Sequence, residues 1–220
     1  MSNIKPHIVS DPEFARRLAK YLLDIGAVLL RPNNPFTWSS GWNSPIYCDN
    51  RLTLRYPAIR KEIASAFNRI IRRHFSEIDV VTGTATAGIP HAAWVAQNMD
   101  LPLAYVRAKS KSYGLAKQIE GVVKKGEQTV VIEDLISTGK SALSVIDALN
   151  FIGASVPGVL AIFSYGFDQA NERFSRRDLP VYTLTDYSIL IDVALEENKI
   201  ADADLEHLNR WRETPETWPS

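Results

Sequence analysis

The N-terminal part of the chain contains two segments in which apolar residues recur every three or four positions. The first spans residues 14–29 and follows a Ser-Asp-Pro-Glu start at residues 10–13, so we expect an amphipathic helix there. The second runs from 57 to 74, opens with proline and closes with basic residues, which predicts a second helix. Between them, residues 36–54 mix aromatic side chains with Ser, Gly and Asn, a pattern typical of short strands and turns.

The pattern changes at about residue 78. Short apolar runs then alternate with glycine-containing loops and amphipathic segments, which predicts a parallel α/β sheet with helices packed against it. We expect strands at residues 78–82, 103–106, 129–132, 156–164 and 181–184, with helices at about 90–98 and 143–150.

The C-terminal quarter has a helical pattern and ends in a tryptophan-rich tail that we expect to be exposed. No repeat, low-complexity tract or linker interrupts the chain. We therefore expect a single domain over residues 1–220. It would comprise an N-terminal extension with a hairpin-like hood (1–56), an α/β core (57–200) and a C-terminal helix and tail (201–220).

Charge and cysteine content narrow the function classes. Lys plus Arg and Asp plus Glu number 25 each, so no global positive field exists to collect nucleic acid, and anion binding must be local. Cys48 is the single cysteine and the first residues lack a signal-peptide pattern, so we expect a cytoplasmic protein. Apolar runs fall far short of the roughly 20 residues that cross a bilayer, so we expect small-molecule ligands and neither nucleic acid nor a membrane as partner.

The segment 130–141 carries the clearest chemistry. An apolar run ends at Glu133 and Asp134, and small hydroxyl residues and Gly139 follow before the next helix. Ligands of open α/β sheets bind beyond the carboxyl ends of the strands, where loop amides and the helix N-terminus favour a phosphate. The two carboxylates repel phosphate but suit ribose hydroxyls or Mg²⁺, directly or through water. An acidic pair at a strand end can also simply cap a helix.

Two nucleotide-binding motifs are excluded by single residues. A P-loop requires glycine five residues before Gly139, where this chain has Asp134. The loop at 83–88 has Ala85 in place of the middle glycine of a dinucleotide fingerprint, and no acidic residue follows about twenty positions on. Its strand-to-helix setting still allows a second anion site built from backbone amides. Two such loops and an acidic pair suggest a sugar with phosphate at both ends.

Residues 107–114 are basic, flanked by glycine and serine, and are followed by the polar residues 117–121. A stretch this polar cannot offset the entropy of its ordering by apolar burial, so we expect a lid that closes when a polyanion binds. The alternative is a solvated surface loop.

These segments resemble a known family. Residues 130–141 are similar to the phosphoribosyl-pyrophosphate (PRPP) motif of type I phosphoribosyltransferases, and residues 36–51, 82–91 and 105–121 narrow the resemblance to orotate phosphoribosyltransferases. The resemblance implies the type I phosphoribosyltransferase fold, an α/β fold with a central parallel sheet flanked by helices and an N-terminal helix/hairpin hood. It also implies Mg²⁺-dependent transfer of phosphoribose from PRPP to orotate. The alternatives are a PRPP-binding regulatory protein of the same fold and a phosphoribosyltransferase for another base.

The resemblance assigns roles residue by residue. It implies catalytic roles for Arg107, Lys111 and Asp134, orotate contacts by Phe36, Ser40 and Ser137, and a homodimer in which the lid is shared. It implies no direct protein ligand for Mg²⁺, which PRPP would hold with Glu133 and Asp134 nearby. The PRPP-binding residues implied are Thr84, Ala85, Thr86, Ala87, Gly88, Arg107, Lys111, Tyr113, Glu133, Asp134, Leu135, Ile136, Ser137, Thr138, Gly139, Lys140 and Ser141.

The lid departs from the family at two positions. Ala108 stands where a lysine is common, and Tyr113 stands where a histidine is common. Tyr113 keeps a hydrogen-bond donor but cannot become cationic, so one pyrophosphate contact should be weaker. For the aromatic residues Trp38, Trp42 and Tyr47, a hood over the active site and packing in a core or dimer interface are both open.

Overall fold

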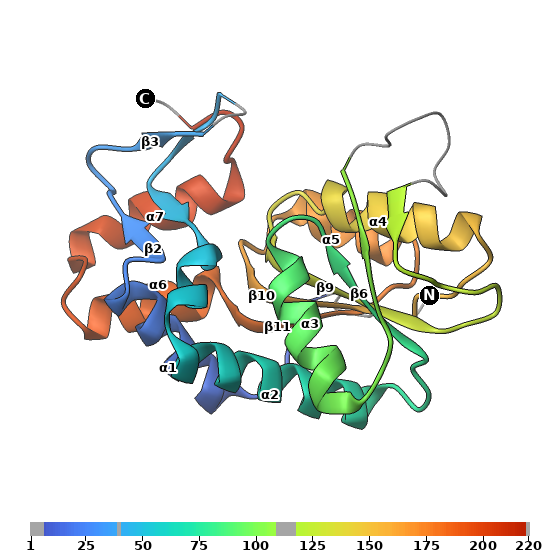
Figure 1. Ribbon diagram of the computed structural model, residues 1–220. Helices are drawn as coiled ribbons and strands as arrows, with labels where there is room; N and C mark the ends of the chain where they lie inside the picture. Colours follow the sequence, from blue (N-terminus) through green and yellow to red (C-terminus); the bar gives the residue numbers. More distant parts are fainter. Residues whose placement is uncertain (1–6, 39–40, 109–117, 219–220) are drawn as a thin grey trace.

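A seven-stranded sheet forms the centre of the protein in the computed structural model, which describes residues 7–38, 41–108 and 118–218 (Figure 1). The strand order is β1-β11-β10-β9-β6-β7-β8, and every neighbouring pair is parallel except β7 and β8. The predicted parallel α/β sheet is therefore confirmed. Its strands are β1 (His7–Val9), β6 (Val80–Thr84), β7 (Leu103–Val106), β8 (Ile119–Glu120), β9 (Thr129–Ile136), β10 (Val159–Ser164) and β11 (Val181–Asp186).

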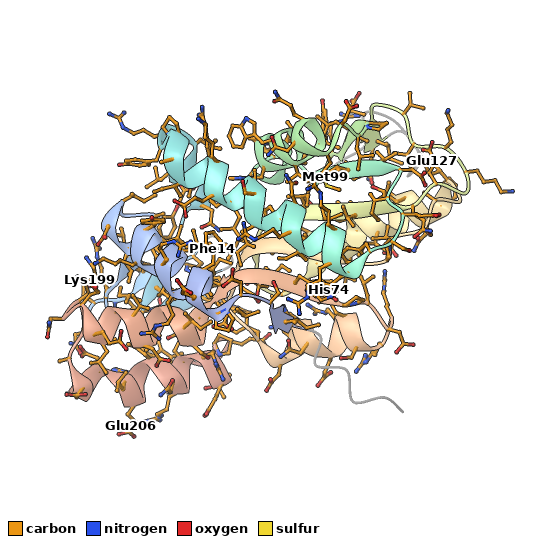
Figure 2. All side chains as sticks on the ribbon, turned by 90° about the horizontal axis from the view of Figure 1, so that it is seen from below. Phe14, His74, Met99, Glu127, Lys199 and Glu206 are labelled. Carbon is orange, nitrogen blue, oxygen red and sulfur yellow. The ribbon has the colours of Figure 1, made fainter. Side chains whose placement is uncertain are left out.

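Helices cover both faces of this sheet, as Figure 1 shows. One face carries α1 (Pro12–Asp24), α2 (Pro57–His74) and α3 (Gly88–Met99), and the other carries α4 (Lys140–Phe151) and α5 (Asp168–Ser175). Along β9, Val130 and Ile132 join the first core and Val131 joins the second, as expected for a strand buried on both faces. Figure 2 shows Phe14 of α1 beside α2, whose Arg69 lies over the Phe14 ring at 5.8 Å. Within the described residues, none of these helices combines the length and apolarity needed to span a bilayer.

The N-terminal hood and the C-terminal helices lie side by side although they come from opposite ends of the chain (Figure 1). The hood consists of two small antiparallel sheets, β2 (Val28–Leu30) with β5 (Ile46–Cys48) and β3 (Phe36–Thr37) with β4 (Asn43–Ser44). A 3-10 helix, Asn50–Arg55, connects the hood to α2. The C-terminal elements are α6 (Tyr187–Glu196), a 3-10 turn (Asp202–Asp204) and α7 (Leu205–Glu213).

The first helix is shorter than its apolar pattern predicts. It ends at Asp24, and Gly26 then takes the left-handed conformation with φ +70°, which a non-glycine residue adopts at a cost. Val28 and Leu29, which we expected to continue the helix, instead pair with Cys48 and Tyr47 of β5. The helical spacing of these two residues was therefore coincidental.

The expectation of an exposed tryptophan-rich tail is wrong. Trp211 is 0% exposed and Trp218 is 8% exposed, and the Trp218 ring lies 4.8 Å from that of His207 on α7. Three further elements have no counterpart in our expectations, the edge strands β1 and β8 and the helix α5. The strand β1 contains only three residues and depends on its parallel pairing with β11, so a local pattern could not reveal it.

Candidate active site

Strand β9 extends four residues further than its apolar run, so Glu133 and Asp134 lie within the strand and not after it. The extension is paired with β10, where Ala161 is opposite Glu133 and Ser164 is opposite Ile136. Strand β6 pairs with β9 only as far as Gly83 and Ile132. The acidic pair therefore lies at the point where β6 has ended and β9 continues, at the carboxyl edge of the sheet where ligands bind in such folds.

A tight loop at residues 137–139 joins β9 to α4. Gly139 is the N-cap of α4 with φ +76°, and a Cβ at this position would lie 2.8 Å from Cε2 of Phe174. Nη1 of Arg173, on α5, donates a hydrogen bond to the Thr138 carbonyl at 2.6 Å. A cavity of about 100 Å³ is enclosed by Glu133 and residues 135–142. The loop and the α4 N-terminus thus form a setting in which backbone amides can bind an anion, and the predicted PRPP-binding residues Leu135 to Ser141 lie in it.

The carboxyl group of Glu133 is buried, with 4% of the residue exposed. Its Oε1 accepts a hydrogen bond from the Asp134 amide at 3.1 Å, whereas Oε2 has no hydrogen-bond partner among the described residues. Burial and the neighbouring Asp134 raise the pKa of Glu133 well above its ordinary value, and burial also raises the pKa of Asp134. A buried polar atom without a partner is costly, so this pair is suited to accept donors from a ligand.

The loop between β6 and α3 reaches the same edge. A Cβ at Gly88, the first residue of α3, would lie 2.4 Å from the Ile132 carbonyl oxygen. The helix therefore approaches β9 as closely as only glycine permits, directly before Glu133. The Thr84 hydroxyl is buried and makes no hydrogen bond of good geometry within the described part of the chain. It lies near enough to the Glu133 carboxyl group to oppose, in part, the rise that burial causes in the pKa of Glu133. The loop that contains the predicted PRPP-binding residues 84–88 thus lies beside the acidic pair.

Arg107 follows β7 at the start of the predicted lid. Its amide donates to the Gln118 carbonyl at 2.9 Å, and its Nε lies 3.0 Å from Oε1 of Glu120. The structure therefore places Arg107 and Gln118 side by side at the base of the lid. Lys111 and Tyr113, between them, and Ser40 of the hood lie outside the described residues.

A larger cavity of about 650 Å³, which we call the hood cavity, separates the hood from the β9–α4 loop. Its lining includes Ser137 and Lys140 and also Tyr165, which directly follows β10. Phe36 is not part of the lining and instead packs behind it, with its ring 5.7 Å from that of Tyr47. The remaining lining residues are Thr37, Trp38, Trp42, Tyr47, Cys48, Leu135 and Thr138. A cavity lined by aromatic side chains together with polar ones suits a flat ring that carries hydrogen-bonding groups.

Two residues near the site were not predicted from the sequence. Asn50 is fully buried, and its Nδ2 donates to the Asp134 carbonyl at 2.7 Å. Nothing in its spacing indicates this contact, because Asp134 is 84 positions away. Tyr165 could have been found as the first residue beyond a predicted strand, and its amide donates to the Ile136 carbonyl at 3.0 Å. Burial raises the pKa of Cys48 well above its ordinary value, so this thiol is a poor nucleophile.

The sequence of this chain is similar to those of known proteins. A model described as "Phosphoribosyl transferase domain" matches residues 53–197. The orotate phosphoribosyltransferase of Halalkalibacterium halodurans is 54% identical over 198 residues, which cover 90% of this chain and 94% of the relative. That of Bacillus subtilis is 54% identical over 200 residues, which cover 91% of this chain and 93% of the relative.

Two solved structures are also similar to the structure of this chain. The orotate phosphoribosyltransferase from Aeropyrum pernix has a TM-score of 0.72 at 29% identity, with 84% of this chain and 99% of that chain covered. The Leishmania donovani UMP synthase has a TM-score of 0.75 at 28% identity, with 90% of this chain and 42% of that chain covered. The identity to the bacterial relatives, over nearly their full length, shows that this chain belongs to the orotate phosphoribosyltransferase family.

Proposed function

We propose that this protein transfers the phosphoribosyl group of PRPP to a ring nitrogen of orotate, giving orotidine 5′-phosphate and pyrophosphate, the penultimate step of UMP synthesis. The observation that carries the proposal is the acidic pair between two anion-binding loops, with an aromatic cavity adjoining them, in a chain 54% identical to orotate phosphoribosyltransferases. One loop suits each phosphate end of PRPP, and the aromatic cavity suits the base.

In the proposed arrangement, residues 137–141 hold the 5′-phosphate through their amides and hydroxyls. Glu133 and Asp134 accept hydrogen bonds from the ribose hydroxyls, which would satisfy the unpartnered Oε2 of Glu133. Residues 84–88 face the pyrophosphate, together with Arg107, Lys111 and Tyr113. Orotate occupies the hood cavity beside Ser137, with Ser40 as a further predicted contact. Phe36, the other predicted contact, would act on the ligand through Tyr47, on which its ring packs.

The chemistry requires no covalent nucleophile. The bond from ribose C1′ to pyrophosphate breaks as the bond to the orotate nitrogen forms, and the proton of that nitrogen is lost to the departing pyrophosphate. The ribosyl group passes through an oxocarbenium-like transition state. Negative charge then grows on pyrophosphate, where Arg107 and Lys111 stabilise it electrostatically. The carboxylate of Asp134 orients the ribose and is attracted to the positive charge that develops on the ring. Exclusion of water by the closed lid protects the oxocarbenium-like centre from hydrolysis.

Magnesium fits this site. Mg²⁺ prefers oxygen ligands and is commonly held by substrate phosphates with one or two carboxylates nearby. The buried carboxyl group of Glu133 and the partly buried one of Asp134 would meet that requirement. We propose that PRPP supplies most of the ligands. When bound, Mg²⁺ would neutralise charge on the leaving pyrophosphate.

We also propose a cytoplasmic homodimer in which the lid of one subunit reaches the active site of the other. Three apolar side chains of the hood and the adjoining 3-10 helix support a protein interface, because Leu29, Tyr47 and Leu52 are each more than 40% exposed. Analytical ultracentrifugation of the wild-type protein would measure the mass directly.

The proposed activity is tested by the change in orotate absorbance when protein, orotate, PRPP and Mg²⁺ are mixed. We expect the signal to change only when all four are present. Adenine, guanine, hypoxanthine and uracil serve as parallel acceptors, and turnover of one of these in place of orotate would indicate another phosphoribosyltransferase. Measurable PRPP binding without turnover of any base would instead indicate a regulatory protein.

Replacement of Asn50 by alanine should lower kcat/KM by about tenfold. The change removes the hydrogen bond that holds the Asp134 carbonyl, and a hydrogen bond contributes on the order of 1 kcal/mol. Thr53→Val is the matched control, because Thr53 is also fully buried and its hydroxyl donates to the Asn50 carbonyl without touching Asp134. Equal kinetic losses in the two variants would contradict a specific role for Asn50.

A further inference from the structure

The C-terminal helix α7 lies directly behind the aromatic wall of the hood cavity. Its Trp211 is fully buried and does not line the cavity, but its ring contacts two residues that do. The ring centroids are 5.7 Å from Trp38 of the hood and 5.6 Å from Tyr165 beyond β10. Both contacts are edge-on, with interplanar angles of 82° and 80°. The indole of Trp211 therefore packs against both of these lining residues, Trp38 and Tyr165.

Trp211 also holds the hood hairpin by a hydrogen bond. Its Nε1 donates to the Asn43 carbonyl at 3.1 Å, and Asn43 pairs with Thr37 in the β3–β4 ladder. That ladder has only two residues on each strand, and so short a hairpin is not stable by itself in water. The adjoining Trp38 has its own indole bond, to the Ile46 carbonyl at 3.2 Å. The position of the hairpin therefore depends on contacts outside it.

Helix α7 is itself fixed to the core. The Tyr187 hydroxyl, at the start of α6, donates to the Leu208 carbonyl at 3.0 Å, and the Tyr187 ring lies 5.5 Å from that of Trp211. Leu208 is fully buried. The domain model that matches this chain ends at residue 197, so α7 lies beyond the part that the model describes.

The phosphate end of the site has a separate support. The β9–α4 loop is held from α5 by the bond between Arg173 and the Thr138 carbonyl, and Trp211 makes no described contact with that loop. The phosphate end of the site thus has a support that Trp211 does not provide.

We infer that Trp211 is a positioning residue for the base-binding end of the active site: it sets Trp38 against Tyr165 and so the shape of the cavity that receives the flat ring. This inference rests on the proposed function, with orotate as the ligand of the hood cavity. Helix α7 acts on base binding through the hood, and α5 acts on PRPP binding through the loop.

The test is a comparison of two Michaelis constants in two variants. Trp211→Phe keeps an aromatic ring but removes the N–H group, and it should raise KM for orotate by about three- to tenfold, the range equivalent to one neutral hydrogen bond. KM for PRPP should stay within about twofold of the wild-type value. Arg173→Met should raise KM for PRPP more than KM for orotate, because the loop that Arg173 supports encloses the small cavity and contributes only part of the lining of the hood cavity.

Trp218→Phe is the matched control, because Trp218 is also a buried C-terminal tryptophan and packs on α7 through His207, away from the cavity lining. It should leave both constants unchanged. Melting temperatures of all variants show whether each is folded at the assay temperature. An unchanged KM for orotate in Trp211→Phe, or equal rises for both substrates, overturns the inference. A wild-type protein that does not consume orotate overturns the proposed function instead.

Discussion

Glu133→Gln is expected to lower kcat by roughly 10²- to 10³-fold while raising the melting temperature at neutral pH. The kinetic loss is expected because a carboxylate that accepts hydrogen bonds from the ribose hydroxyls is replaced by a neutral amide, which is a weaker acceptor and also carries an NH₂ group. The loss of one preorganised active-site group has this magnitude. The gain in stability follows from burial. The charged carboxylate has an unpartnered oxygen and a negative neighbour, and the amide removes the charge while its oxygen can still accept from the Asp134 amide.

The sign of the pH dependence follows from the raised pKa of Glu133. Because this pKa is higher in the folded state than the ordinary value of 4.5, the folded protein binds more protons than the unfolded chain above that pH. The stability contributed by the neutral carboxyl group is complete below pH 4.5 and is lost as pH rises through the folded pKa. Wild-type stability should therefore fall over this window relative to Glu133→Gln, as measured by thermal unfolding at several pH values.

Asp147→Asn is the control for the loss of one carboxylate. Asp147 lies on α4 and pairs with Arg177 on the surface, at 2.6 Å, where such a pair contributes little. Its replacement should change neither kcat nor the pH profile of stability. A Glu133→Gln variant that is less stable than the wild type at pH 7 to 8 would show that the buried carboxylate is satisfied in the free protein.

Lys111→Ala is expected to lower kcat by about two orders of magnitude or more, with a modest rise in KM for PRPP. The lysine would act on the negative charge that develops on pyrophosphate as the bond to C1′ breaks, so its contribution is larger in the transition state than in the ground state. Arg107, at the base of the same lid, would still bind PRPP. Lys124→Ala is the control, because Lys124 is an exposed lysine beyond the lid, and its removal should leave kcat unchanged.

A mixture of two inactive variants tests whether the lid is shared. If Lys111 acts in the partner's site, a heterodimer of Lys111→Ala and Glu133→Gln subunits has one site with both residues intact. Random exchange of equal amounts should then restore about one quarter of wild-type activity. If each lid closes over its own subunit, both sites of the heterodimer remain defective and no activity returns. A normal kcat for Lys111→Ala by itself would contradict the lid assignment.

The elements that the sequence predicted well are those with a local cause. The alternation of apolar runs, glycine loops and helices from residue 78 onward predicted the existence, type and order of β6, α3, β7, β9, α4, β10 and β11, with bounds that differ from the observed ones by at most four residues. The chemistry of the β9–α4 loop was also local, because the carboxylates, hydroxyls and Gly139 occupy consecutive positions at one strand end. Residues at consecutive positions stay close together whatever the arrangement of the rest of the fold.

The tertiary structure decided what depends on a distant partner. Strand β9 continues through its acidic pair because β10 is there to pair with it, and residues 28–30 form a strand because β5 lies beside them. Trp211 is buried because the hood, more than 160 positions earlier, covers it. The sequence by itself thus determined the family and the sheet and predicted the phosphate-binding chemistry. The hood cavity with its support Trp211, and the bond from Asn50 to Asp134, arise instead from contacts between segments whose spacing along the chain carries no signal.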